Sequence, residues 1–152
     1  MKSDPIIVLH VSIVSANDLG KIQRELYSID TMFQSRSKPT SNSIRTSIEL
    51  DNLLKSSGID LSNSEQRRLL GKQLQFVRRT APSVQLVFSK QPDGRSVSML
   101  VKWFREFGHP NTLLNIAIDP SIGGGCLLKT STKTFDFSYS KLLKNRPIKL
   151  TR

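Results

Sequence analysis

The spacing of apolar residues changes at Ala81-Pro82, and this change limits what the chain can fold into. Before it, apolar side chains recur every three or four residues, which is the spacing of one face of an α-helix. After it, apolar residues alternate along the stretch 84–88, which is the pattern of a β-strand. We therefore expect an α+β fold, with a mainly helical part over residues 1–81 and an α+β domain over residues 82–152.

The first part opens with a run rich in β-branched residues, which predicts a strand over residues 6–14. Ser15 to Asp18 then offer helix caps, and the apolar spacing that follows predicts a first helix as far as Phe33. Residues 35–43 contain no apolar side chain and one proline, so we expect a linker there.

Two more helices are expected before the change of pattern. One runs from about Ile44 to Ser57, and Gly58 is placed to end it in a left-handed turn. The other opens at Ser62 and Glu65, which stand three apart as in a capping box, and it ends before Ala81-Pro82. The N-terminal part thus holds one strand and about three helices.

In the C-terminal domain, the sequence pattern predicts a small mixed sheet with one crossover helix. The expected order is a strand at 84–88, a helix at about 94–107, a strand at 113–118, a glycine loop and two short strands. A terminal basic helix follows. Phe135 and Phe137 share one face of the last strand, and we expect them to fill the core.

The net charge is +11, and it is concentrated in the second half. Residues 1–80 carry 12 basic and 8 acidic side chains, and the rest carries 11 basic and 4 acidic ones. Such an excess attracts nucleic acid, an anionic membrane surface or an acidic protein. Hydrophobic residues make up only 37% of the chain, so we expect it to finish burying its apolar faces against a partner.

Cysteine usage and hydropathy place few limits on the cell compartment. Cys126 is the one cysteine, so no disulfide can form within the chain. No stretch approaches the roughly 20 apolar residues of a membrane helix, and the apolar run at 6–9 is too short for a signal peptide. We expect a soluble protein that is made in the cytoplasm and stays there.

The stretch from Asp119 to Leu143 reads DPSIGGGCLLKTSTKTFDFSYSKLL. It resembles the signature of the delta subunit of the F-type ATP synthase, the oligomycin-sensitivity-conferring protein family. An aspartate opens a loop, small residues and glycine precede three apolar residues and a basic one, and an apolar-Asp-x-Ser step leads into a basic helix. The residues on those positions are Asp119, Gly124, Gly125, Lys129, Asp136 and Ser138. With the preceding strand, helix and strand, the resemblance covers residues 84–143.

The resemblance implies a non-enzymatic subunit that links the catalytic head to the peripheral stalk. Its partners would be the stalk b subunits and the alpha subunits of the head, at the cytoplasmic face of the bacterial plasma membrane. No cofactor is implied. We expect the stalk to contact Trp103 and the basic residues of the terminal segment, Lys141, Lys144 and Arg146.

Two departures from the family are visible in the sequence. The family places two arginines in its terminal helix, where this chain has Ser140 and Leu142. Its N-terminal bundle has six helices, whereas about three are expected here. The structural residues of the motif also have physical roles that do not depend on the resemblance. Gly123 to Gly125 permit a tight reversal of the chain, and Asp136 or Ser138 can cap the terminal helix.

The sequence gives little support to several more specific functions. A phosphate loop needs a Lys-Ser/Thr step and a helix after its glycines, whereas an apolar strand follows Gly125. His10, His109 and Cys126 make no metal-ligand cluster, and Asp119 and Asp136 occupy turn positions, so no catalytic constellation is expected.

The alternative from another class is a small nucleic-acid-binding protein, which would use the basic residues of the third helix. These residues are Arg67, Arg68, Lys72, Arg78 and Arg79. Three of them, at positions 68, 72 and 79, can share one face. A solvated helix face is the plainer interpretation, and filter binding at two salt concentrations separates the two.

Overall fold

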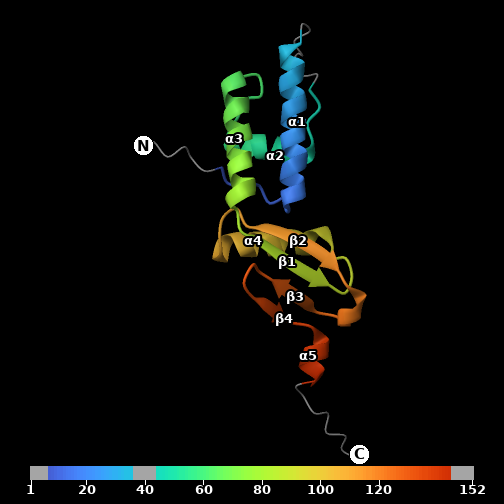
Figure 1. Cartoon of the computed structure of the whole chain (residues 1–152). Coiled ribbons are helices and arrows are strands. Elements are labelled where there is room, and N and C mark those ends of the chain that lie inside the picture. The colour runs from blue at the N-terminus through green and yellow to red at the C-terminus, as the bar shows by residue number, and fades with distance from the viewer. Residues whose placement is uncertain (1–6, 36–43, 145–152) are drawn as a thin grey trace, which may run out of the picture.

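Helices gather at one end of the molecule and a small sheet at the other (Figure 1). The computed structural model describes residues 7–35 and 44–144 of the 152. We call residues 7–81 the helical unit and residues 82–144 the sheet unit. The helices precede the sheet along the chain, as the change in apolar spacing predicts, and the α+β class is confirmed.

The elements follow one another in a single order along the chain. They are α1 (Ala16–Gln34), α2 (Ile48–Ser57), α3 (Ser64–Thr80), β1 (Ser83–Phe88), α4 (Gly94–Phe107), β2 (Leu113–Ile118), the 3-10 turn η2 (Pro120–Ile122), β3 (Cys126–Lys129), β4 (Thr134–Asp136) and α5 (Tyr139–Lys144).

Local capping explains where α1 and α3 begin. Ser15 caps α1 through a reciprocal capping box with Asp18, so the residues expected to cap this helix do so. The box expected at Ser62 does not form. Asn63 caps α3 instead, because its side chain accepts hydrogen bonds from the backbone N–H groups of Glu65 and Gln66. Ser62 is bound to the carboxylate of Asp60.

α2 begins four residues later than its apolar spacing predicts. Ser47 caps it, and the carboxylate of Glu25 on α1 accepts hydrogen bonds from both the backbone N–H and the hydroxyl of Ser47, each at 2.6 Å. Gly58 ends α2 with φ at 67°, the expected left-handed turn. The linker expected over residues 35–43 lies, beyond Ser35, outside the described residues.

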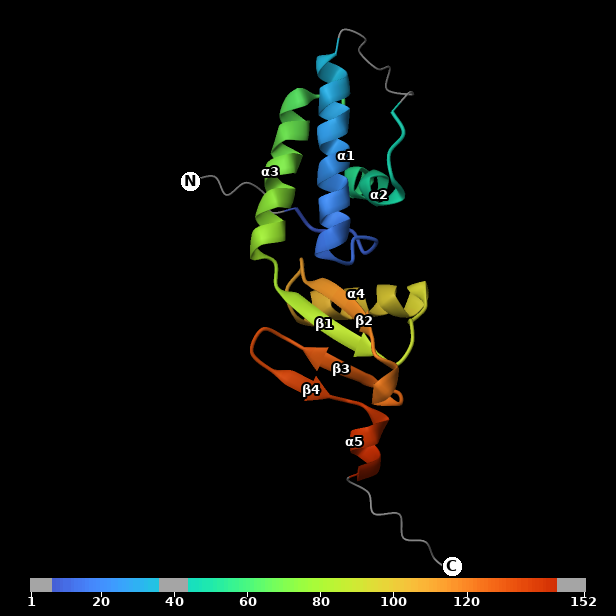
Figure 2. The ribbon, with the colours of Figure 1, turned by 45° about the vertical axis from the view of Figure 1, so that its right-hand side comes forward.

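The core of the helical unit is built from all three helices. α1 and α3 lie side by side, and α2 packs across them (Figures 1 and 2). The apolar side chains that are fully buried here include Leu19, Ile22, Leu50, Leu53, Leu70 and Leu74. Leu113 of β2 joins the same cluster, so this core continues to the edge of the sheet.

The sheet has four strands in the order β2-β1-β3-β4. β1 and β2 are parallel and are joined by α4, the one crossover helix expected. β3 lies antiparallel to β1, and β4 antiparallel to β3, so the sheet is mixed as expected. α4 packs on one face, where Val101 meets Leu86 and Leu114 in a second core cluster.

The strand expected over residues 6–14 is wrong: residues 7–14 form an irregular segment with a turn at 11 and 12. Its apolar side chains serve two cores. Ile7, Leu9 and Ile13 belong to the core of the helical unit, whereas Val11 and Val14 pack on the core of the sheet unit. A segment that is buried on two sides needs apolar side chains in both directions. In a sequence, such a segment has the same pattern as a buried strand.

Side chains satisfy the backbone of this segment in place of a strand partner. The amide of Asn111 accepts from Leu9 N–H at 3.0 Å and donates to Ile7 C=O at 2.9 Å. The guanidinium of Arg105 donates to the carbonyls of Leu9, His10 and Ile13. The segment therefore joins the helical unit to the sheet unit.

Candidate partner-binding site

The residues that carry the family resemblance begin at a tight turn between η2 and β3. Asp119 caps η2, because its carboxylate accepts from the backbone N–H of Ser121 at 3.0 Å. Gly123, Gly124 and Gly125 follow with φ values of 66°, 126° and 76°. These conformations disfavour other residues, so the chain reverses here only because glycine is present.

The turn packs directly on the start of α5. Tyr139 N–H donates to Gly124 C=O at 3.2 Å, and Ser140 Oγ donates to Ile122 C=O at 3.2 Å. A Cβ on Gly124 would lie 2.6 Å from the Tyr139 ring, and one on Gly125 would collide with the carbonyl oxygen of Phe137. The glycines are therefore required by close packing as well as by backbone conformation.

Asp136 and Ser138 form the corner against which this turn rests. Asp136 Oδ1 accepts from Ser138 N–H at 2.8 Å, and the Ser138 side chain is buried. This hydrogen bond to Ser138 lowers the pKa of Asp136, and the charges of Lys141 and Lys144 lower it further. A hydrogen bond to Ser121 likewise lowers the pKa of Asp119. Asp119 thus caps η2, and Asp136 fixes the backbone at Ser138, just before α5 begins.

An exposed apolar stripe runs along α4, on the side turned away from the sheet. Met99, Trp103 and Phe107 stand four residues apart, and their exposed fractions are 58%, 54% and 71%. Trp103 contacts the ring of Phe104 edge-on at 5.0 Å and lies 5.7 Å from the ring of Phe107. Large side chains of this kind, held in place yet exposed, are typical of interface anchors.

Phe135 and Phe137 are not in the core, contrary to expectation. Leu86 pairs with Leu128, and Leu128 with Phe135, so Phe135 lies on the face of the sheet that α4 covers. α4 lies alongside β1 and β2 and does not reach β4 (Figure 2). Phe135 and Phe137 are therefore 43% and 56% exposed, with their rings stacked 6.4 Å apart.

We use the name aromatic surface for two exposed groups taken together, one on α4 and one at the end of β4: Met99, Trp103 and Phe107, and Phe135 and Phe137. Only Trp103 was singled out from the sequence. A signal for the two α4 neighbours is present there, because a four-residue spacing places them on one side of a helix. No such signal exists for Phe135 of β4 or for Phe137 just after it, because their exposure depends on where α4 stops covering the sheet.

Basic residues of α5 lie beyond β4, on the far side of the β3–β4 hairpin from α4 (Figures 1 and 2). Lys141 and Lys144 are exposed there. Arg146 lies outside the described residues. The residues proposed for the stalk thus do not form one cluster: Trp103 belongs to the aromatic surface, and the lysines flank it beyond the hairpin.

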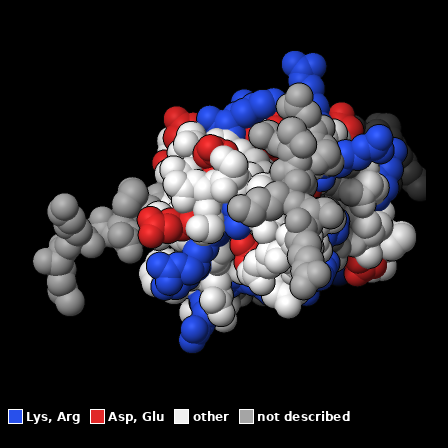
Figure 3. All heavy atoms as spheres, turned by 90° about the horizontal axis from the view of Figure 1, so that it is seen from above, with Lys and Arg blue, Asp and Glu red and all other residues white. Residues whose placement is uncertain are grey.

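Two of the five basic residues of α3 are engaged within the fold, whereas the three that were expected to share a face, Arg68, Lys72 and Arg79, are exposed. Arg67 is buried and forms an ion pair with Asp30 at 2.9 Å, and Arg78 donates to Gln23. Seen from the helical end, Lys and Arg side chains are spread around the margin, with Asp and Glu between them (Figure 3). A phosphate-backbone site would concentrate them in one patch, so nucleic acid gains no support from this arrangement.

Metal-ligating side chains form no cluster in residues 7–35 and 44–144. No three His, Cys, Asp or Glu side chains in these ranges gather as metal ligands would. Burial raises the pKa of the Cys126 thiol, which disfavours the reactive thiolate.

None of the helices in the described ranges combines the length and apolar character needed to cross a bilayer. A scan against models of protein families and a search of curated proteins each find no match to this chain.

Proposed function

We propose that this chain is a non-enzymatic coupling subunit of an F-type ATP synthase, linking the catalytic head to the peripheral stalk. The observation that carries the proposal is the packing of the glycine turn on the Asp136–Ser138 corner. Sequence positions that resemble the delta family are the ones on which this close contact depends. The work of such a subunit is mechanical, because it keeps the head static during proton-driven ATP synthesis or hydrolysis.

In this proposal the sheet unit docks on the C-terminal helices of the stalk b subunits through the aromatic surface. Burying a tryptophan and several phenylalanines supplies the strong, slowly dissociating contact that a mechanical connection requires. Lys141 and Lys144 on one side, with Arg146 beyond them in the sequence, steer an acidic partner into register.

The helical unit is the part that would face the alpha subunits of the head. It is smaller than the six-helix bundle of the family that the chain resembles, so its contact with the head would be correspondingly smaller. The complex would hold this chain at the cytoplasmic face of the bacterial plasma membrane as a peripheral subunit. No cofactor takes part.

Co-purification tests the assembly directly. An affinity-tagged full chain, expressed in its own cells and extracted with mild detergent, should bring down stalk and catalytic subunits in fixed proportion. Mass spectrometry of the eluate identifies them. An eluate that contains neither kind of subunit would remove the proposal.

Trp103→Ala tests the docking surface. We expect the variant to lose about tenfold or more in affinity for the stalk subunits, because anchors of this kind carry most of an interface's energy. Its melting temperature should barely change, since the side chain is more than half exposed.

Ile48→Ala is the matched control, because Ile48 is an exposed apolar residue of the helical unit. It should leave stalk affinity unchanged. If Trp103→Ala instead unfolds the chain, Trp103 belongs to the core and the surface is wrongly assigned.

A further inference from the structure

The sheet has two edges, and the chain itself covers one of them in part. At the β2 edge, Leu114 N–H donates to Val14 C=O at 2.8 Å, so the segment 7–14 pairs with the start of this strand. At the other edge, β3 is the one described element that lies alongside β4, and α5 continues beyond the end of the strand (Figures 1 and 2). All three residues of β4 are exposed. The β4 edge is therefore the open side of the sheet.

The backbone of β4 points alternately toward β3 and away from it. Phe137 N–H donates to Cys126 C=O at 2.9 Å, and the register places Phe135 in the same kind of hydrogen-bonded pair. Because every second residue of an antiparallel strand bonds its neighbour, the N–H and C=O groups of Thr134 and Asp136 point outward. No group of the described residues forms a hydrogen bond with them. These groups are free to pair with a strand of another molecule.

Lysines surround this edge and outnumber the acidic residues near it. Residues 126–144 contain Lys129, Lys133, Lys141 and Lys144, with Asp136 as the single acidic residue. None of these lysines forms an ion pair with a described residue. The edge is therefore positive, and an acidic strand is the partner whose charge complements it.

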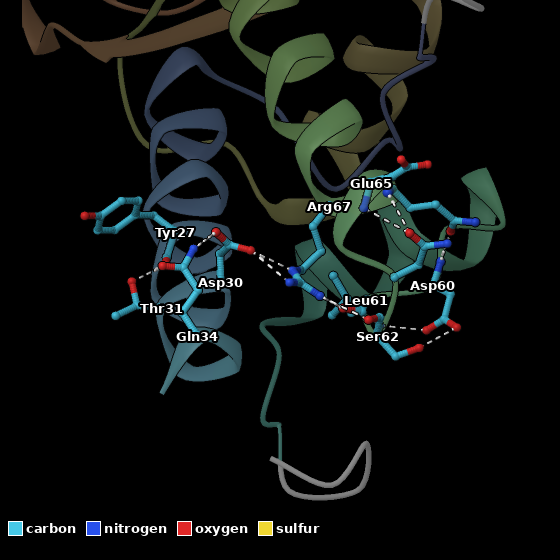
Figure 4. Close-up of polar contacts among 11 residues, drawn as sticks. Tyr27, Asp30, Thr31, Gln34, Asp60, Leu61, Ser62, Glu65 and Arg67 are labelled. Atoms are coloured by element: carbon cyan, nitrogen blue, oxygen red, sulfur yellow. Dashed lines mark hydrogen bonds and ion pairs between the residues drawn. The ribbon is translucent and has the colours of Figure 1, made fainter. Parts of the chain in front are cut away.

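The helical unit shows the contrasting case, in which the chain supplies the partner of its own cation. Arg67 reaches from α3 to α1, where its guanidinium lies 2.9 Å from Asp30 Oδ1, as Figure 4 shows. It also donates to the carbonyl of Leu61. Lys129 and Lys133 are exposed, and neither ammonium group has a hydrogen bond or an ion pair within the described residues. Their charge is therefore available to a partner.

Charge also excludes the two occupants that are nearest at hand. Residues 145–152 contain Arg146, Lys149 and Arg152 and no acidic residue, so they complement the lysines poorly. A second copy would bring the same lysines to the edge, and its net charge of +11 would add to the repulsion. The occupant is therefore an acidic segment of a different chain.

We propose that β4 accepts one extended, acidic segment of another protein as a fifth strand of the sheet. Side chains of a strand alternate between the two faces of the sheet. Apolar side chains of the added strand lie beside Phe135 and Phe137, on the face where α4 packs. Acidic side chains lie on the other face, which Lys129 shares with Thr134. The proposal stands on the edge of the sheet and holds whether or not the chain belongs to an ATP synthase.

Synthetic strands supply the probe. The first is a fluorescein-labelled peptide of about nine residues, in which valine alternates with glutamate and threonine. The second has lysine in place of every glutamate. With the full chain, fluorescence anisotropy should detect binding of the acidic peptide and at least tenfold weaker binding of the basic one.

Backbone hydrogen bonds distinguish strand addition from attraction by charge alone. A third peptide keeps the acidic sequence and carries N-methyl groups on its central residues, so its side chains are unchanged while its backbone donors are lost. We expect it to bind at least tenfold more weakly than the unmethylated peptide. In the complex with the acidic peptide, amide hydrogen exchange should slow at Thr134 and Asp136. The amide of Phe135, which already pairs with β3, should change little.

Thr134→Pro removes one outward donor from the edge. The ladder with β3 does not use this N–H, and proline is tolerated at such positions of an edge strand, so the Phe135 amide should stay protected. The variant should bind the acidic peptide at least tenfold more weakly. Thr134→Val is the matched control, because it changes the same side chain and keeps the N–H. It should bind as the parent does.

Four results would each overturn the proposal. Equal binding of the acidic and basic peptides would remove the charge argument, and equal binding of the N-methylated peptide would show that no strand is added. Slow exchange at Thr134 and Asp136 in the free chain would mean that the chain itself occupies the edge. Exchange that slows as the protein concentration rises would mean that a second copy does. If Thr134→Pro fails to fold, the methylated peptide and the exchange rates still decide.

Discussion

The two units of this chain differ in how completely each buries its apolar side chains and pairs its charged ones. The helical unit buries large apolar residues from all of its helices, among them Ile22, Leu53 and Leu74. The core cluster of the sheet unit has four buried members, Val84, Leu86, Val101 and Leu114, and the aromatic surface beside it stays in solvent. The helical unit thus has the larger core, although Tyr27, Ile48 and Phe76 also stay exposed in it.

Charge follows the same division. All three ion pairs formed among the described residues lie in the helical unit. The cations of the sheet unit, including Lys102, Lys133 and Lys141, form no ion pair with a carboxylate of residues 82–144. The difference teaches that the helical unit contains the larger core and the ion pairs, whereas the sheet unit leaves its cations unpaired beside the aromatic surface, which agrees with the docking role proposed for it.

The largest expected effect is a core truncation in the helical unit. Leu70→Ala should lower the free energy of unfolding by about 2–5 kcal/mol, because Leu70 is fully buried and its loss leaves a cavity. Trp103, the single tryptophan, reports the sheet unit by fluorescence, and far-UV circular dichroism reports mainly the helices. We expect both signals to shift to the same lower urea midpoint, because Leu113 and residues 7–14 connect the cores.

Two separate transitions in this variant would contradict that expectation. Tryptophan fluorescence that kept the parent midpoint while the helical signal melted earlier would show that the units fold independently. The comparison between them would then be one between two domains instead of two ends of one cooperative structure.

Much of this fold could be predicted because its elements depend on nearby residues. The capping of α1 by Ser15, the stop at Gly58 and the alternation in β1 each involve residues a few positions apart. The segment 7–14 could not be predicted in this way. Its partners, Arg105 and Asn111, lie more than 90 residues further along the chain, and its apolar run fits a buried strand equally well.

The candidate site divides along the same line. The glycine turn and the Asp136–Ser138 corner are local, so sequence reasoning could assign the turn at Gly123 to Gly125. The capping of the terminal helix by Asp136 or Ser138 stays a prediction, because Asp136 accepts from Ser138 N–H, which precedes that helix. The aromatic surface is not local. Phe135 has the alternation of a core residue, and its exposure arises because the crossover helix covers only part of the sheet. The spacing of residues in a sequence does not show which part of a sheet a helix will cover.

A smaller effect is expected where the two units join. Arg105 donates to four carbonyl oxygens, those of Leu9, His10, Ile13 and Thr112. Burial lowers its pKa to about 10, so it remains charged at neutral pH. Arg105→Leu should cost about 1–3 kcal/mol, because those carbonyls lose their donor without regaining water.

The same substitution should separate the two probes of unfolding. With the joint weakened, the tryptophan and helical signals should no longer share one urea midpoint. Lys102→Leu is the matched control, since Lys102 lies on the same helix and is exposed. It should change stability by no more than about 0.5 kcal/mol. Equal losses from the two variants would mean that Arg105 does not join the units.

The smallest effect concerns acid, and it belongs to the sheet unit. The hydrogen bond from Ser138 lowers the pKa of Asp136 below 3.8, so the folded chain binds a proton there less readily than the unfolded chain. The resulting stabilisation is present above pH 3.8 and is lost as the pH falls through the lower, folded-state pKa. The amide shift of Ser138, followed by NMR, should titrate with a midpoint below 3.8.

Asp136→Asn isolates this contribution, because the amide oxygen can still accept from Ser138 N–H but carries no charge to titrate. At pH 7 the variant should melt slightly below the parent, having lost the favourable charge beside Lys141 and Lys144. As the pH falls through the folded-state pKa, the parent becomes neutral at this position too, and the two melting temperatures should converge. A difference that stayed constant between pH 7 and pH 2 would show that the Asp136 charge does not stabilise the corner, and that the sheet unit holds its docking face by packing alone.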